Sequence, residues 1–148
     1  MDSPTALNVL VTGAFGNIGR HVVRELAGRG HRVRAFDLPT AANQRAARGF
    51  DGVDVHWGDV RDAAAVQRAV AGQDAVAHLA FILPPLSERD PTLSRAVNVG
   101  GARNLVDALQ ARCQEARLVY ASSYAIYGDT RRTEGLLTAD SPVAPINH

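Results

Sequence analysis

Three glycines spaced three residues apart are the strongest chemical signal in this sequence. They lie in TGAFGNIG, residues 12–19, where Gly13, Gly16 and Gly19 separate an apolar run from a helical pattern. Glycines placed in this way permit a tight turn, close approach of a phosphate to the main chain, and close packing of helix on strand. The helix start then offers N–H groups and a positive dipole end to an anion. The segment predicts a pyrophosphate-binding loop, with an ordinary tight turn as the alternative.

An acidic residue follows at a distance that suits a dinucleotide. Asp37 ends the second apolar run, eighteen residues after Gly19. A carboxylate at this place accepts hydrogen bonds from ribose hydroxyls and repels a 2′-phosphate. We therefore predict NAD as the cofactor in preference to NADP. Arg32 and Arg34 lie nearby in the sequence and complicate that preference, and an ordinary loop aspartate is the alternative interpretation.

Apolar runs alternate with helical patterns along the chain. Strands are predicted over residues 7–12, 33–36, 53–57, 75–80 and 118–122. Helices are predicted over residues 17–27, 41–48, the stretch that Asp62 caps, and 93–111. This alternation predicts an α/β fold, a doubly wound parallel sheet of the Rossmann type. The apolar first, fourth and fifth strands favour burial on both faces, and the alternating third strand favours an edge, as in the order 3-2-1-4-5.

Composition favours one compact domain and excludes several classes of function. The chain of 148 residues is 46% hydrophobic and carries a net charge of +1, so neither nucleic acid nor an anionic membrane is an expected partner. Its apolar runs fall short of the ~20 residues that span a bilayer. No basic segment precedes the first apolar run, so no signal peptide is expected. One cysteine, Cys113, and histidines without metal-site spacing fit a cytoplasmic protein without a bound metal.

Five ordered motifs resemble those of the extended short-chain dehydrogenase/reductases of the NAD-dependent epimerase/dehydratase type, and the resemblance covers about residues 7–148. They are TGAFGNIG (12–19), GDVRD (58–62), HLA (78–80), NVGG followed by NL (98–105) and YASSYAIYG (120–128). In that family the second motif holds the adenine, the third lies beside the nicotinamide ribose, and the first Asn of the fourth supports the fold and the cofactor. Together with the glycine loop and Asp37, the resemblance implies these cofactor-binding residues: Gly13, Phe15, Gly16, Asn17, Ile18, Gly19, Asp37, Asp59, Val60, Leu79, Ala80 and Asn98.

The resemblance also implies that Ser123 is catalytic, its hydroxyl bonding a substrate oxygen while hydride moves to or from C4 of the nicotinamide. The alternative is a serine that caps a turn. The resemblance further implies a YxxxK pair, whose tyrosinate acts as base and whose lysine lowers its pKa. All sixteen basic residues here are arginine, and the Pro-spaced run 140–148 leads in relatives to the missing tyrosine. His78 lies on an expected buried strand and is interpreted as a core residue, not a base.

These features predict an NAD-dependent oxidoreductase of the epimerase/dehydratase type, acting on a sugar nucleotide or a related hydroxy or keto compound. Residues 1–148 would form its cofactor-binding half, without the C-terminal substrate lobe and inactive alone. The alternative is a non-catalytic dinucleotide-binding module, either an NmrA-like sensor or a truncated gene product. With the sixth strand absent, the fifth would be an exposed apolar edge and the helix over 93–111 would be half covered. The oligomeric state stays open, with a homodimer among the candidates.

Overall fold

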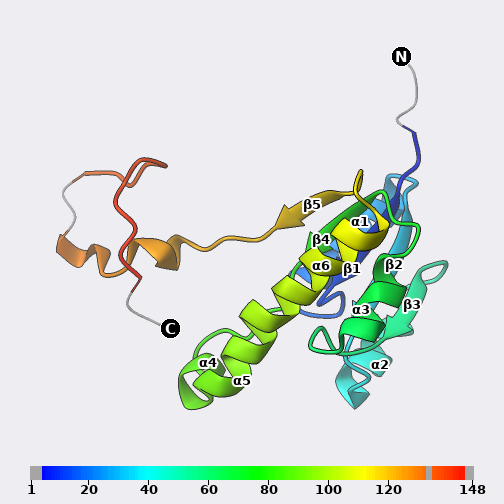
Figure 1. Ribbon diagram of the computed structural model, residues 1–148, viewed down its shortest axis with the longest axis horizontal. Coiled ribbons are helices and arrows are strands. Elements are labelled where there is room, and N and C mark those ends of the chain that lie inside the picture. Colours follow the sequence, from blue (N-terminus) through cyan, green and yellow to red (C-terminus); the bar gives the residue numbers. More distant parts are fainter. Residues whose placement is uncertain (1–4, 133–134, 146–148) are drawn as a thin grey trace.

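A five-stranded parallel sheet forms the centre of the computed structural model, which describes residues 5–132 and 135–145 (Figure 1). The strands are β1 (Asn8–Thr12), β2 (Arg32–Asp37), β3 (Asp54–Trp57), β4 (Ala75–His78) and β5 (Arg117–Tyr120). Their order is β3-β2-β1-β4-β5, and every neighbouring pair is parallel. The chain therefore winds outward from β1 in one direction and then in the other, which confirms the predicted doubly wound order.

Helices connect the strands and cover both faces of the sheet. They are α1 (Gly19–Gly28), α2 (Ala41–Ala47), α3 (Ala63–Val70), α4 (Leu86–Arg89), α5 (Pro91–Arg95) and α6 (Ala102–Arg112). Asp62 caps α3 as predicted, because its Oδ1 accepts the N–H groups of Ala64 and Ala65 at 2.9 and 3.2 Å. Short 3₁₀ turns follow β5 at Tyr124–Tyr127 and Thr130–Arg132.

The predicted single helix over residues 93–111 is interrupted by a π-helical turn. This turn covers Ala96–Gly101 and joins α5 to α6. Gly101 packs directly on Val60, since a Cβ at Gly101 would lie 2.7 Å from Val60 Cγ2. The wider turn thus occurs where the helix approaches the loop after β3. This contact joins segments that are distant in sequence, so the helical periodicity of the sequence does not predict it.

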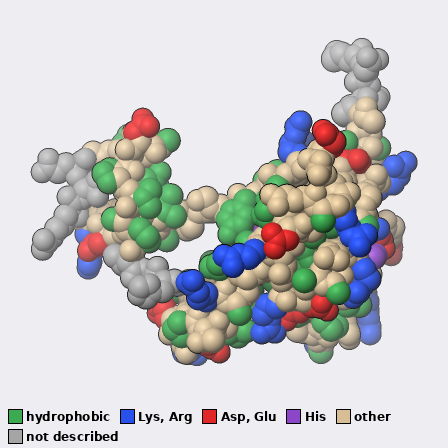
Figure 2. Space-filling view, in the orientation of Figure 1, with side chains coloured by type: hydrophobic (Ala, Val, Ile, Leu, Met, Phe, Trp, Pro, Cys, Tyr) green, Lys and Arg blue, Asp and Glu red, His purple; other side chains and the backbone are tan. Residues whose placement is uncertain are grey.

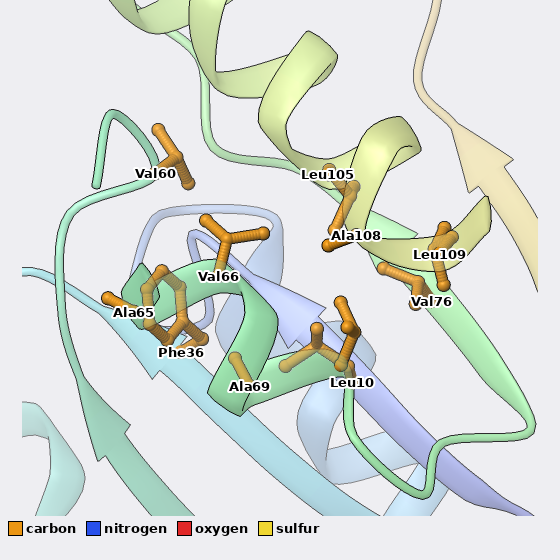
Figure 3. Packing of buried hydrophobic residues seen from close by; sticks show 11 residues of the cluster. Leu10, Phe36, Val60, Ala65, Val66, Ala69, Val76, Leu105, Ala108 and Leu109 are labelled. Atoms are coloured by element: carbon orange, nitrogen blue, oxygen red, sulfur yellow. The ribbon is translucent and has the colours of Figure 1, made fainter. Parts of the chain in front are cut away.

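Two apolar clusters hold the layers together. Consecutive residues of β1 point to opposite faces, so Leu10 belongs to one cluster and Val11 to the other. In the first cluster the side chains from β1, β2 and β4 meet those of α3 and α6 (Figure 3): Leu10, Phe36, Val76, Val66, Ala69, Leu105 and Leu109. The second cluster packs α1 and the loop after α2 on the other face. Burial on both faces accounts for the apolar texture of the central strands.

β5 is exposed. Its run of apolar residues favoured burial on both faces, and that prediction is wrong for this strand. Val119 is 58% exposed and Tyr120 is 50% exposed. The physical reason is that, among the described residues, β5 has β4 as its single neighbour in the sheet, and the chain beyond it leads away from the sheet (Figure 1). The exposed apolar edge expected from the resemblance is confirmed, and exposed Val99 and Val106 show that the helix over 93–111 is half covered.

Two further features concern the surface. The first helix was predicted over residues 17–27, but α1 begins only at Gly19, and Ile18 before it is 64% exposed. The segment after β5 carries exposed apolar side chains that gather on the part projecting from the sheet (Figure 2), among them Tyr124, Leu136 and Val143. Among the described residues, no helix has the length and apolarity to cross a bilayer, and none of their side chains cluster as a metal site.

Candidate functional site

A cavity of about 410 Å³ lies where the strand order reverses. It is bordered by residues that follow β1, β2, β3 and β4, at the carboxyl ends of these strands. In open parallel sheets this crevice is the usual ligand position, because the connections on its two sides diverge there. Of the residues predicted to bind a cofactor, seven line it: Gly13, Gly16, Asp37, Asp59, Val60, Leu79 and Ala80.

The glycine turn forms one wall of this cavity. Gly13 has φ +64°, and a Cβ there would lie 2.7 Å from the carbonyl oxygen of Leu79 and 2.9 Å from Cα of Ala80. The turn closes on itself, because the N–H of Gly16 donates to the carbonyl of Gly13 at 3.1 Å. A Cβ at Gly19 would overlap that same carbonyl. Only glycine fits these positions, so the bare main chain of the turn faces the cavity.

Asp37 stands opposite the glycine turn and is held in place by three donors. Its Oδ2 accepts the main-chain N–H of Phe15 at 2.9 Å, and its Oδ1 accepts the N–H of Leu38 at 2.8 Å. The side-chain amide of Asn43 donates to Oδ1 at 3.1 Å. Asn43 also lines the cavity, and the sequence analysis did not predict it. Its position in the first turn of α2, three residues after the cap Thr40, was the sequence feature that could have indicated it.

The segment after β3 forms the far wall. Arg61 donates from Nε to Oδ2 of Asp59 at 2.9 Å, and this hydrogen bond holds the pKa of the Asp59 carboxyl below its usual value. Asn104 of α6 donates to the carbonyls of Val60 and Arg61, each at 3.0 Å. The bonds from Asn104 hold Val60 at the cavity wall. The charge of Arg61 is paired with that of Asp59.

Further lining residues were not predicted from the sequence. They are Phe36, Leu38, Gly58, Arg61, Phe81, Ile82, Leu86, Leu93 and Val97. Most are apolar residues of β2, α4, α5 and the loops around them, and they have no motif of their own.

Other predicted cofactor residues lie behind the cavity wall. The ring of Phe15 packs between Phe50 and Trp57, with centroids 5.7 and 5.3 Å away, and only its main chain reaches Asp37. Asn17 accepts a hydrogen bond from Arg20 at 2.8 Å. Together with Ile18 and Gly19, these residues form the approach to α1 and do not line the cavity.

Asn98 is also placed outside the cavity lining. Its Oδ1 accepts the N–H of Ile82 at 2.8 Å, and its Nδ2 donates to the carbonyl of Ile82 at 2.9 Å. This two-way bond pins the loop after β4, in which Phe81 and Ile82 line the cavity. Asn98 thus acts on the cavity through the shape of that loop.

Ser123 is not brought to the cavity. It lies on the exposed segment that leaves the sheet after β5 (Figure 1), and its Oγ accepts the N–H of Ala125 at 3.2 Å as the cap of a 3₁₀ turn. The capping interaction is the alternative that the sequence left open. The catalytic assignment of Ser123 therefore stays a prediction. The last three residues of the Pro-spaced run, 146–148, lie outside the described residues.

His78 is a buried core residue. Its side chain is fully buried at the end of β4, and burial lowers its pKa to about 4, so it is neutral at pH 7. Its Nδ1 lies 2.7 Å from Oγ1 of Thr12. The interpretation of His78 as a core residue agrees with this placement.

Comparison with known proteins gives a consistent picture. Residues 9–148 match the NAD dependent epimerase/dehydratase family. A 3β-hydroxysteroid dehydrogenase/Δ5→4-isomerase of Mycobacterium tuberculosis is 37% identical over 123 residues, which cover 80% of this chain and 32% of that protein. The UDP-glucose 4-epimerase of Lactobacillus helveticus is 33% identical over 144 residues, covering 95% of this chain and 42% of the epimerase.

A solved structure shows the same relationship. The UDP-glucose 4-epimerase of Thermus thermophilus, in complex with NAD, superposes with a TM-score of 0.84 at 32% identity. That match covers 95% of this chain and 45% of the epimerase. The chain therefore spans between a third and a half of the length of these relatives.

Proposed function

We propose, from the premise that this chain belongs to the NAD dependent epimerase/dehydratase family, that it binds NAD as the cofactor half of an oxidoreductase. The substrate would be a sugar nucleotide or a related hydroxy or keto compound. The single observation that carries the proposal is the cavity at the strand-order reversal, where the bare Gly13 turn faces the fixed carboxylate of Asp37.

The residues present fit this cofactor. A side chain at Gly13 would collide with the Leu79 carbonyl, so the turn leaves main chain accessible to a phosphate. The three hydrogen bonds to Asp37 occupy three of the roughly four lone-pair sites of a carboxylate, which leaves one on Oδ2 for a ribose hydroxyl. Among the cavity-lining residues the cation Arg61 is paired with Asp59, so a 2′-phosphate would meet the charge of Asp37 uncompensated.

The mechanism assigns each group of residues a task. When bound, NAD accepts or returns a hydride at C4 of its nicotinamide. The main chain of the glycine turn that leads into α1 would hold the pyrophosphate at the positive end of the helix dipole. Asp37 would bind the adenosine ribose, Asp59 and Val60 the adenine, and Leu79 with Ala80 the nicotinamide ribose. The resemblance assigns to Ser123 a hydrogen bond from its hydroxyl to the substrate oxygen.

The resemblance assigns the proton of the substrate hydroxyl to the tyrosinate of a YxxxK pair, in which the lysine lowers the pKa of the tyrosine. The chain contains no lysine, and an arginine stays protonated and does not relay a proton. We therefore expect the chain alone to bind NAD and to show no turnover. Calorimetry with NAD and NADP tests the first statement: NAD is expected to bind at least about tenfold more tightly, because the Asp37 charge repels the 2′-phosphate. Folded protein that gives no heat with NAD overturns the proposal.

A second candidate is a non-catalytic dinucleotide-binding module of the NmrA-like kind. It is favoured by the position of Ser123, which caps a turn away from the cavity, and by the absence of lysine. The coding DNA beyond codon 148 distinguishes the two. A frame that continues with Tyr-x-x-x-Lys supports the oxidoreductase, whereas a stop codon supports the module.

A further inference from the structure

The ends of β1 and β4 are joined by one buried side-chain hydrogen bond. Thr12 and His78 are the last residues of these strands and lie opposite each other in the parallel register. Both are almost fully buried, at 2% and 0% exposure, and Oγ1 of Thr12 lies 2.7 Å from Nδ1 of His78. This bond sits directly beneath the place where the glycine turn begins.

The surroundings of Thr12 determine which tautomer His78 adopts. Oγ1 of Thr12 accepts the main-chain N–H of Ala80 at 3.3 Å and that of Leu79 at 3.2 Å, and the N–H of Leu79 is shared with the main-chain carbonyl of Thr12 at the same distance. A hydroxyl has two acceptor sites and one hydrogen, so these donors occupy both acceptor sites. The hydroxyl hydrogen must then be donated to Nδ1 of His78. His78 is therefore the acceptor in this bond and carries its own hydrogen on Nε2.

The same bond controls a wall of the cavity. Leu79 and Ala80 line the cavity, and their main chain is the part that a Cβ at Gly13 would strike. Resting on the proposed function, we propose that His78 is a positioning residue for the cofactor: its Nδ1 orients the Thr12 hydroxyl, which holds the Leu79–Ala80 main chain against the Gly13 turn. His78 acts through Thr12 and touches no substrate or cofactor.

The other ring nitrogen shows what the histidine supplies. Nε2 of His78 is buried without a hydrogen-bond partner in the described part of the chain. The imidazole ring packs against the rings of Phe81 and Tyr120, with centroids 5.0 and 5.6 Å away. A buried donor without a partner destabilises a protein, and an apolar side chain of similar size would avoid that penalty. His78 has an acceptor, Nδ1, that an apolar residue lacks, and this acceptor is the part of the side chain that makes a hydrogen bond.

Two matched pairs of variants test the proposal in the 148-residue chain without cofactor. T12S keeps the hydroxyl and T12V removes it with little change in shape. H78N keeps an acceptor on the atom bonded to Cγ, whereas H78L keeps bulk and removes the acceptor. Nitrogen-15 NMR reports the tautomer of His78 in the wild type, and amide exchange reports protection of Leu79 and Ala80. Denaturant unfolding of each variant identifies any that fails to fold.

The expected result is an Nε2–H tautomer, with amide exchange at Ala80 about five- to tenfold faster in T12V and H78L than in T12S and H78N. Leu79 should change less, because its N–H also donates to the main-chain carbonyl of Thr12. NAD affinity should fall by a similar factor in the same two variants. An Nδ1–H tautomer, or equal amide protection in T12S and T12V, overturns the positioning role. Wild-type protein that shows the tautomer and the exchange pattern but binds no NAD overturns the proposed function, while the Thr12–His78 arrangement stands.

Discussion

The carboxylate of Asp37 accepts the main-chain N–H of Phe15 at 2.9 Å, which ties the end of β2 to the glycine turn that follows β1. This bond makes the acidic residue part of the turn's own structure. The orientation of the carboxylate toward the cavity is therefore set before any ligand arrives, and less ordering is required on binding.

Asp37→Asn should weaken NAD binding by about tenfold, because an amide has fewer acceptor sites for a ribose hydroxyl and no negative charge. The same change should bring NADP affinity close to that for NAD, because it removes the repulsion of the 2′-phosphate. Calorimetric titration with both dinucleotides measures the ratio. Asp51→Asn, an exposed aspartate in the turn before β3, is the matched control and should leave the ratio unchanged. An unaltered ratio in Asp37→Asn would refute the assignment of the ribose contact.

Gly13→Ala should lower the free energy of unfolding by at least about 2 kcal/mol, because φ is +64° and the new Cβ would lie 2.7 Å from the Leu79 carbonyl. Binding of NAD should be lost with it. Gly28→Ala is the control, because a Cβ there meets nothing within 4 Å and alanine favours a helix. Urea unfolding of both variants checks the pair. Equal stability of the two would contradict the close contact of turn and β4 loop.

Gly101→Ala and its neighbour Gly100→Ala separate helix propensity from contact with the cavity wall. A Cβ at Gly100 meets nothing within 4 Å, whereas one at Gly101 would lie 2.7 Å from Val60 Cγ2. Gly100→Ala should therefore keep wild-type NAD affinity and gain a little stability. Gly101→Ala should displace Val60, lose about 1 kcal/mol of stability and bind NAD several-fold more weakly. If both variants bind NAD equally well, Val60 is not part of the cofactor site.

Stability should fall as the pH drops from about 6.5 to about 4. Burial lowers the pKa of His78 from 6.5 to about 4, so in this window the unfolded chain takes up a proton that the folded chain does not. The loss attributable to His78 is at most about 3 kcal/mol. The pKa of Asp59 is lowered by its hydrogen bond to Arg61, so its own contribution is lost only below the ordinary range of a carboxyl. Urea unfolding of wild type and H78N at several pH values tests this. The free energy of unfolding should fall less steeply between pH 6.5 and 4 in H78N, and equal slopes would show that His78 does not cause the pH dependence.

Much of the fold could be predicted from the sequence because its signals are local. The strand positions follow from short apolar runs, and the alternating third run indicated an edge strand, which agrees with the observed strand order. The position of Asp62 directly before a helical pattern indicated that it caps the helix. The glycines at 13, 16 and 19 indicated a turn by their spacing. Each of these features depends on neighbours within a few residues along the chain.

The rest was decided by contacts between segments far apart in sequence. The approach of Gly101 to Val60 at the π-helical turn, the amide of Asn43 on Asp37, and the bond from Thr12 to His78 appear in no local pattern. The exposure of β5 likewise depends on what lies beside it, not on its own apolar residues. The sequence by itself therefore determined the parallel sheet, the glycine turn and the acidic residue that faces it. Only the tertiary structure decided the contact of His78 with Thr12, the partners of Asp37 and the place of Ser123, because hydrogen-bond partners are chosen by distance in space.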